Sequence, residues 1–282
     1  MKKILVPTDF SKTASTATDV AFDIAKRSGA SIVLLHVIEE VTRGSFNVGG
    51  QVSYSSMEEK LFTLEMIKKA KAQMAKVVKD PKYAAVKVDG ELRVGNPFHG
   101  MRTIITDQKV DLVVMGTAGR TAPSSMLIGS NTEKVIRNSH CPVLTVQSKP
   151  ATSDFKNIAY ATAMSKDEEV FSRIVKRTQQ IYGSTVHLVR VNTPGDFQRD
   201  QVVKDYMEKF AKKVGLKHYT INVYNDLTIE EGIIRFSDVI NADLIAMATH
   251  GRSGFAQVIA GSVAEDVASH SKRPVLTFVV KK

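Results

Sequence analysis

The sequence of 282 residues lacks tryptophan and contains a single cysteine, Cys141. One cysteine excludes an internal disulfide, so a reducing, cytoplasmic location is expected. Long apolar runs are also missing, because no segment approaches the ~20 residues that a membrane-spanning helix needs. The opening segment, MKKILVPTDFS, has an apolar run too short for a signal peptide and is predicted to form a strand. We therefore expect no membrane partner.

Positive charge exceeds negative charge, with 39 Lys and Arg against 29 Asp and Glu and a formal net charge of +10. The lysines are interleaved with acids and apolar residues at helical spacing, as in DYMEKFAKKVGLKH, which indicates solvated helix faces. No stripe of aromatic residues accompanies them, as single-strand nucleic-acid binding would require. The sequence therefore argues against a nucleic-acid partner and leaves a general attraction for anions, nucleotides included.

Catalytic and metal-binding patterns are scarce. The seven histidines are scattered, and neither His-x3-His nor Cys-x2-Cys spacing occurs. Cys141 precedes Pro142 at a predicted strand start, and we expect this thiol to be buried and unreactive. The sequence thus provides no catalytic residue and no set of metal ligands.

The second half of the chain repeats the first. VDLVVMGTAGR at 110–120 matches ADLIAMATHGR at 242–252, and the two segments are 132 residues apart. IGSNTEKVIRNSHCPVLTV at 128–146 matches AGSVAEDVASHSKRPVLTF at 260–278 with the same separation. A repeat of this length predicts two copies of one structural unit.

The beginnings of the two units are further apart than their ends. KKILVPTDFSKTAS at 2–15 pairs with KNIAYATAMSKDEE at 156–169, a separation of 154 residues, so the first unit contains an insertion. The glycine- and serine-rich segment 41–56 is the expected place for it. A polar, proline-containing linker, QSKPATSDF, joins the units, and we predict domains at 1–148 and 154–282.

Each unit alternates strands with helices. In the first unit, strands are predicted at KILVPTD, SIVLLHVI, AAVKVDGELR, DLVVMG and CPVLTV. Ser11 is the predicted N-cap of a helix that Gly29 ends, and Asn96 with Pro97 opens another helix. The pattern predicts an α/β fold with a doubly wound parallel sheet and helices on both faces. Ligands of such sheets bind beyond the carboxyl ends of the strands, at the switch in strand order.

The loop GTAGRTAPSSMLIGS, residues 116–130, leads from a predicted strand to a predicted helix. Glycines let backbone N–H groups approach an anion, and those of Gly129, Ser130 and Asn131 would open the helix, where the dipole favours phosphate. Ser130 could add a hydroxyl donor and Arg120 a positive charge. The loop is neither a Walker loop nor a G-x-G-x-x-G fingerprint, so from spacing alone a purely structural glycine turn stays open.

The glycine spacing is similar to a known pattern. Gly116, Gly119, Gly129 and Ser130 follow G-x2-G-x9-G-[S/T], which resembles the ATP-binding pattern of the universal stress protein family. The segments ILVPTDFS, LLHV and GSNTEKVIRNSHCPVLTV resemble that family too, and the resemblance covers nearly the whole chain as two tandem domains. It implies an adenine-nucleotide alpha-hydrolase-like (Rossmann-like) fold, with a five-stranded parallel sheet in each domain.

The resemblance also implies an ATP site in the first domain. The implied nucleotide-binding residues are Pro7, Thr8, Asp9, Val37, Met115, Gly116, Gly119, Arg120, Gly129, Ser130 and Asn131. Asp9 would accept hydrogen bonds from ribose or adenine, and Val37 would contact adenine through its backbone. Mg²⁺ would bind mostly through the phosphates and water. The structural alternatives are an acid at a helix N-terminus for Asp9 and a core strand residue for Val37.

The second domain departs from this pattern. Alanine replaces the acid and the first glycine, at Ala163 and Ala248, whereas the last glycine–serine pair survives at Gly261 and Ser262. The phosphate end of the loop is therefore expected to persist without the ribose acceptor. Loss of a buried acceptor costs ~1–3 kcal/mol, so we expect ATP to bind the first domain and to bind the second weakly or not at all.

The resemblance implies an ATP-binding regulatory protein of the stress response. The alternatives are an interaction scaffold that does not need nucleotide and a slow ATPase, for which no catalytic base is evident. The insertion at 41–56 is hypothesised to cover the first-domain site. PVLTVQ at 142–147 and PVLTFVV at 274–280 are predicted sheet edges that pair with each other as an internal pseudo-dimer, and a further homodimer of chains stays open.

Overall fold

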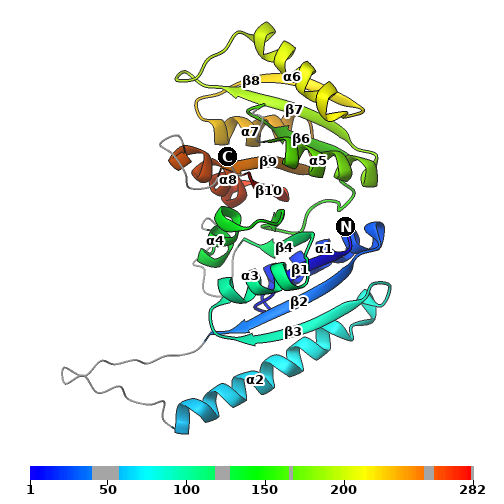
Figure 1. Ribbon diagram of the computed structural model, residues 1–282, viewed down its shortest axis with the longest axis vertical. Helices are drawn as coiled ribbons and strands as arrows, with labels where there is room; N and C mark the ends of the chain where they lie inside the picture. The colour runs from blue at the N-terminus through cyan, green and yellow to red at the C-terminus, as the bar shows by residue number, and fades with distance from the viewer. Residues whose placement is uncertain (40–56, 118–127, 165–167, 251–256, 281–282) are drawn as a thin grey trace, which may run out of the picture.

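The ten strands that the structure describes belong to one continuous sheet. The structure is a computed structural model that describes residues 1–39, 57–117, 128–164, 168–250 and 257–280. The strand order is β3-β2-β1-β4-β5-β10-β9-β6-β7-β8, so each half of the chain builds five adjacent strands. The first half fills the lower part of Figure 1 and the second half the upper part.

The first half contains β1 to β5. In chain order its elements are β1 (Lys3–Pro7), α1 (Lys12–Ser28), β2 (Ser31–Ile38), α2 (Met57–Val78), a 3-10 turn (Pro81–Tyr83), β3 (Val88–Val94), α3 (Pro97–Asp107), β4 (Leu112–Gly116), α4 (Ser130–Asn138) and β5 (Val143–Val146). The predicted caps of α1 are confirmed: Ser11 Oγ accepts from the N–H of Ala14, and Gly29 ends the helix with a positive φ of 70°. Asn96 caps α3 through His99 N–H, with Pro97 at its first turn, as predicted.

The second half repeats this order without the long insertion. Its elements are β6 (Asn157–Ala161), α5 (Glu169–Tyr182), β7 (Thr185–Asn192), α6 (Asp200–Val214), β8 (Tyr219–Asn225), α7 (Ile229–Val239), β9 (Leu244–His250), α8 (Gln257–His270) and β10 (Val275–Val280). Strands within each half are parallel. The predicted fold class, two Rossmann-like units with five parallel strands each, is confirmed.

The two halves join through their last strands. β5 and β10 run antiparallel, with Thr145 opposite Val275 and Val143 opposite Thr277. The predicted pairing of these two edges is therefore confirmed, and it extends two five-stranded sheets into one. Pairing satisfies the backbone groups that a free edge would expose.

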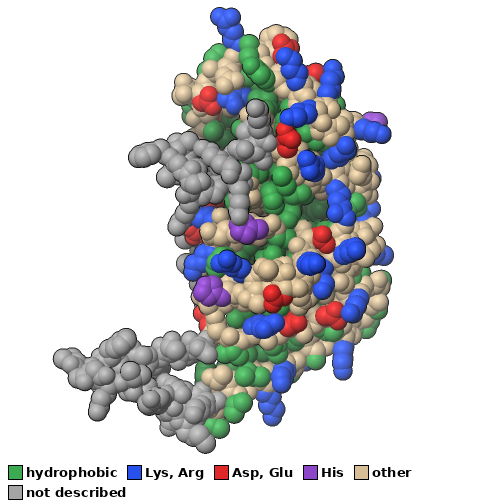
Figure 2. Space-filling model, viewed as in Figure 1, with side chains coloured by type: hydrophobic (Ala, Val, Ile, Leu, Met, Phe, Trp, Pro, Cys, Tyr) green, Lys and Arg blue, Asp and Glu red, His purple; other side chains and the backbone are tan. Residues whose placement is uncertain are grey.

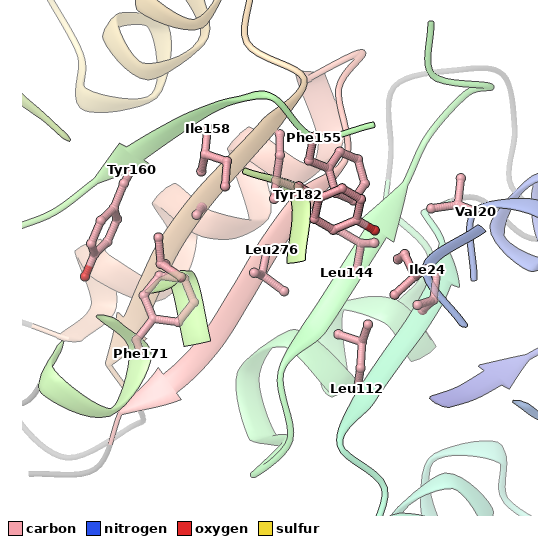
Figure 3. Close-up of a cluster of buried hydrophobic side chains, with 14 of the residues drawn as sticks. Val20, Ile24, Leu112, Leu144, Phe155, Ile158, Tyr160, Phe171, Tyr182 and Leu276 are labelled. Atoms are coloured by element: carbon pink, nitrogen blue, oxygen red, sulfur yellow. The ribbon is translucent and has the colours of Figure 1, made fainter. Parts of the chain in front are cut away.

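Helices cover both faces of the sheet and bury two separate apolar layers. One layer lies beneath α1, α2, α5 and α6 and includes Ile24, Phe171 and Tyr182 (Figure 3). The other lies beneath α3, α4, α7 and α8 and includes Ile104 and Phe236. Successive strand residues point to opposite faces, so continuously apolar strands such as β2 supply both layers.

A pair of aspartates shows the repeat at the level of single hydrogen bonds. Asp111 Oδ2 accepts from the backbone N–H groups of Lys2 at 2.6 Å and Lys3 at 3.0 Å. Asp243 Oδ2 accepts in the same way from Lys156 at 3.0 Å and Asn157 at 2.9 Å. Each aspartate, which directly precedes the central strand of its half, thus binds the backbone at the start of the first strand of that half. In the described part of the chain, no helix combines the length and apolar character that crossing a bilayer requires.

Candidate functional site

The candidate site lies where the strand order changes direction in the first half. β1 has β2 on one side and β4 on the other. After β1 the chain turns to α1 on one face, and after β4 it passes to α4 on the opposite face. The two connections therefore diverge above neighbouring carboxyl ends, which is the arrangement that leaves a ligand crevice in this class of sheet.

A tight turn follows β1. The N–H of Thr8 donates to Leu35 O at 2.8 Å, which extends the pairing of β1 with β2 by one bond. Thr8 Oγ1 then accepts from the N–H of Phe10 at 3.0 Å, and Phe10 adopts a positive φ of 60°. The second half repeats this turn at Thr162 and Met164, with a 2.9 Å bond and a φ of 59°. The turn is thus part of the fold of both halves.

Asp9 takes part in the same turn. Its Oδ1 accepts from the N–H of Ser11 at 2.9 Å, immediately before α1. This bond gives Asp9 a structural role at the helix start, which is close to the structural alternative considered from the sequence. It also fixes the carboxylate at the carboxyl end of β1, where a ligand in the crevice would meet it.

His36 supports this turn, a role that sequence reasoning did not assign to it. Its Nδ1 lies 2.7 Å from Thr8 O, and its ring centroid lies 4.6 Å from that of Phe10. The histidine of the segment LLHV therefore holds the backbone that carries Asp9. The corresponding position in the second half is Arg190, whose guanidinium pairs with Asp196 at 2.7 Å instead.

Val37 combines a partly buried side chain with a backbone directed at the crevice. Its side chain packs on α3, where a Cβ on Gly100 would come within 3.1 Å of Val37 Cγ2. Leu35 O bonds to Thr8 on the β1 side of β2, whereas Ile38 O bonds to Gly95 on the β3 side. Because this direction alternates along a strand, the N–H and C=O of Val37 face the β1 side, beyond the last paired residue Pro7.

Gly116 ends β4 against the first turn of α1. A Cβ at this position would lie 2.8 Å from Thr13 Cγ2 and 3.2 Å from the Thr13 carbonyl carbon. Glycine is therefore required here by packing within the protein. Met115, the residue before it, is buried in the layer beneath α3 and α4, so its side chain faces the core.

The end of the glycine loop forms the N-terminus of α4. Gly129 is the N-cap and provides no side chain to accept from the first N–H groups, which begin at Ser130 and Asn131. Gly129 N–H donates to Thr117 O at 2.7 Å, and Thr132 Oγ1 donates to Gly116 O at 3.0 Å. These bonds hold the start of α4 at the carboxyl end of β4. The predicted site residues Gly119 and Arg120 and the insertion 41–56 lie outside the described residues.

The corresponding positions of the second half are arranged differently. α8 begins at Gln257, so Gly261 and Ser262 lie beyond its first turn, whereas Ser130 is the first residue of α4. The expectation that the phosphate end of the loop persists in the second half is therefore wrong. The helical residues before Gly261 extend α8 through that stretch, so its backbone N–H groups belong to the helix interior.

A buried carboxylate also distinguishes the second half. Glu168 is 2 % exposed and accepts from Thr162 Oγ1 at 2.6 Å and from the N–H of Ala163 at 3.0 Å. Tyr160 lies 3.3 Å from the same carboxylate, and burial together with that charge raises the pKa of the tyrosine. In the second half the carboxylate at this turn therefore comes from Glu168, the residue just before α5. It accepts from the N–H of Ala163, the residue that corresponds to Asp9.

Comparisons with known proteins agree with this architecture. The model of the universal stress protein family matches residues 1–147 and again residues 154–279. Universal stress protein MJ0577 of Methanocaldococcus jannaschii is 35% identical over 156 residues, which cover 52% of this chain and 96% of that protein. Universal stress protein Slr1230 of Synechocystis is 25% identical over 99% of this chain and its own whole length. The crystal structure of a universal stress protein from Archaeoglobus fulgidus covers 98% of both chains with a TM-score of 0.76 at 22% identity.

Proposed function

Since this chain belongs to the universal stress protein family and has two tandem units, we propose that it is a stress-response regulatory protein that binds ATP in its first unit. The observation that carries this proposal is the convergence of two helix starts on Gly116. Thr13 of α1 packs on this glycine, and Thr132 of α4 bonds to its carbonyl. Helix N-termini carry partial positive charge, so their convergence favours a phosphate group between them.

The start of α4 is the phosphate end of the proposed site. Its N-cap Gly129 provides no side-chain cap, so the first N–H groups of the helix suit an anionic ligand. Ser130 is exposed and can add its hydroxyl as a donor. Mg²⁺, where it accompanies ATP, would be held mainly by phosphate oxygens and water.

The other end of the proposed site lies over β1 and β2. Asp9 supplies a carboxylate fixed at the carboxyl end of β1, suited to accept from ribose hydroxyls. The backbone of Val37 offers an N–H and a C=O to the edge of an adenine ring. Pro7 and Thr8 form the floor between them at the end of β1.

The two halves are proposed to differ in function. In the second half Ala163 provides no side-chain acceptor, and Gly261 and Ser262 lie within a helix. An ATP molecule would therefore lose contacts at both ends. This supports one nucleotide site per chain, with the second half as a structural and signalling partner rather than a second binding unit.

The test is a calorimetric titration of the full chain with ATP and MgCl2. We expect one site per chain and a tenfold or greater loss of affinity in Asp9→Asn, which keeps an oxygen for the Ser11 N–H and removes the charge. Asp205→Ala, at an exposed acid on α6, serves as the matched control and should bind as the parent does. Two equal sites would refute the asymmetry, and no binding by the folded parent would refute the nucleotide proposal in favour of a scaffold.

A further inference from the structure

A groove lies between the two halves, away from the candidate nucleotide site. It has a volume of about 340 Å3 and is bounded by α1 on one side and α5 on the other, with Leu144 of β5 and Leu276 of β10 on its floor. In Figure 2 hydrophobic side chains reach the surface in the middle of the view, between the two halves. Pockets of about 300–1,000 Å3 at domain junctions are typical small-molecule sites.

The groove results from the way the halves join. On the opposite face, α4 and α8 pack against each other across the join. There the guanidinium of Arg137 on α4 donates two hydrogen bonds to the carboxylate of Glu265 on α8. On this face, α1 and α5 stand on either side of the groove. The β5–β10 pair therefore has helices packed together over one face and a groove over the other.

The wall of the groove that α5 provides has apolar side chains spread over three turns, together with Arg177 and Thr178. Val170, Ile174 and Ile181 all face it, at the spacing of a single helix face. Val170 is 50 % exposed, although it belongs to this face. When an apolar group covers a concave apolar surface that is open to solvent, the free energy of the system falls.

Tyr182, at the end of α5, adds an unpaired polar atom to this apolar wall. The residue is 4 % exposed, and in the part of the chain that the structure describes its hydroxyl has no hydrogen-bond partner. In Figure 3 the hydroxyl points toward Ile24 of α1, which lines the groove together with Leu144. A buried hydroxyl without a partner is destabilising, so an acceptor brought by a ligand would be favoured here.

Among the described residues that line the groove, Arg177 can pair with an anionic ligand. Burial raises the pKa of the Tyr182 hydroxyl, and the acids Asp23 and Asp154, which lie outside the lining, raise it further. Arg177 is exposed and lies on the same face of α5 as Ile174 and Ile181. The acid at the opposite rim, Asp111, is already engaged by two backbone N–H groups. The chain as a whole carries a net charge of +10, which raises the local concentration of anions.

We propose that this groove binds an amphipathic carboxylate, with an unbranched hydrocarbon chain over Leu144 and Leu276 and a carboxylate head that pairs with Arg177 and accepts from Tyr182. The apolar floor provides most of the binding free energy, and the arginine and the phenol select an acid over a neutral molecule. The site is independent of the nucleotide crevice, which lies at the carboxyl ends of β1 and β4.

The first experiment uses the full chain, with decanoate as the probe and decanol as its uncharged counterpart, both below their aggregation concentrations. Displacement of an environment-sensitive dye, checked by calorimetry, measures the two affinities. We expect saturable binding of decanoate at one site and at least tenfold weaker binding of decanol. Val170→Asp should weaken both ligands at least tenfold, whereas Val202→Asp, at a similarly exposed valine on α6, should leave both unchanged.

Two further variants test the polar contacts without risking the fold. Arg177→Met keeps the apolar stem and should lower decanoate affinity at least fivefold while leaving decanol unchanged. Tyr182→Phe removes the unpaired hydroxyl, so it should weaken decanoate several-fold with no loss of thermal stability. A loss of stability in Tyr182→Phe would show that the hydroxyl is paired within the protein and would overturn its assigned role.

Three results would overturn the proposal as a whole. The first is no saturable binding of decanoate by the folded parent. The second is binding that Val170→Asp does not affect, because the ligand would then lie elsewhere. The third is concentration-dependent self-association that Val170→Asp abolishes together with an absence of decanoate binding, which would make the groove a contact between copies of the chain.

Discussion

Gly116 and Thr13 are in such close contact that any larger residue at the end of β4 would collide with α1. The Cβ of an alanine would lie 2.8 Å from Thr13 Cγ2, closer than carbon atoms approach in proteins. Gly116 is the first glycine of the nucleotide-loop pattern, yet packing against Thr13 already requires a glycine at this position. The same contact brings the start of α1 beside the strand that leads to α4, so packing and the candidate site depend on one residue.

We predict that Gly116→Ala destabilises the protein by about 1–3 kcal/mol, because the added methyl forces α1 away from β4. Urea unfolding monitored by circular dichroism measures the change. Gly195→Ala is the control, since a Cβ there meets nothing within 4 Å. The stability of this variant should equal that of the parent or rise slightly. Thr13→Ala in the Gly116→Ala background should recover part of the loss. Equal stability of Gly116→Ala and the parent would contradict the packing explanation.

The paired aspartates give a prediction about the repeat. Asp111→Ala and Asp243→Ala each remove an acceptor of two backbone N–H groups at the start of a half. Each should cost about 1.5–3 kcal/mol, because hydrogen bonds to a charged group are among the stronger ones. Hydrogen exchange should then increase at Lys2 and Lys3 in the first variant and at Lys156 and Asn157 in the second. Exchange that rises equally in both halves would indicate a global effect instead.

The contact between α4 and α8 links the candidate site's helix to the second half. Glu265 has a side chain only 9% exposed, while Arg137 is more open and also contacts Glu133 at 3.0 Å. Arg137→Met should therefore destabilise more than Glu265→Gln, since it leaves a nearly buried carboxylate without its partner. A double-mutant cycle should give a coupling of about 0.5–3 kcal/mol.

The exposed pair Lys204 and Asp200, 3.9 Å apart within α6, provides the matched control cycle. Its coupling should be below about 0.5 kcal/mol because both side chains are solvated. Equal coupling in the two cycles would mean that the contact between α4 and α8 contributes no more than an ordinary surface ion pair. A large value for Arg137 and Glu265 would identify them as the energetic link between the halves.

Much of the fold follows from local signals in the sequence. Ser11 and Gly29 mark the ends of α1, and Asn96 with Pro97 marks the start of α3, because caps act through bonds within one turn. The repeat of the apolar β5 and β10 segments, together with the family resemblance, predicts that these two edges pair. These features depend on neighbours in sequence or on a property that both halves share.

The remaining features depend on contacts between distant residues. The packing of Thr13 on Gly116 joins positions far apart in the chain, and no spacing rule reports it. The aspartate shared by DLVV and DLIA was visible in the repeat, but its partners become clear only when strand starts lie side by side. The glycine–serine pair of the second half does not mark the start of α8, because the helix already begins at Gln257. Where that helix begins depends on the residues before the pair rather than on the motif.

Cys141 provides a prediction with a defined pH dependence. Its side chain is 3 % exposed, as expected from the sequence, its Sγ lies 3.3 Å from Val110 O, and burial raises the pKa of the thiol to about 12. At pH 8 the native thiol is therefore protonated and should react with a disulfide reagent at least a hundredfold more slowly than in the urea-unfolded chain.

Because the folded-state pKa of Cys141 lies above its unfolded value, the contribution of this residue to stability is complete below about pH 8.5 and is lost as the pH rises toward 12. Cys141→Ala should remove that part of the alkaline slope, and an identical slope in both proteins would contradict the assignment.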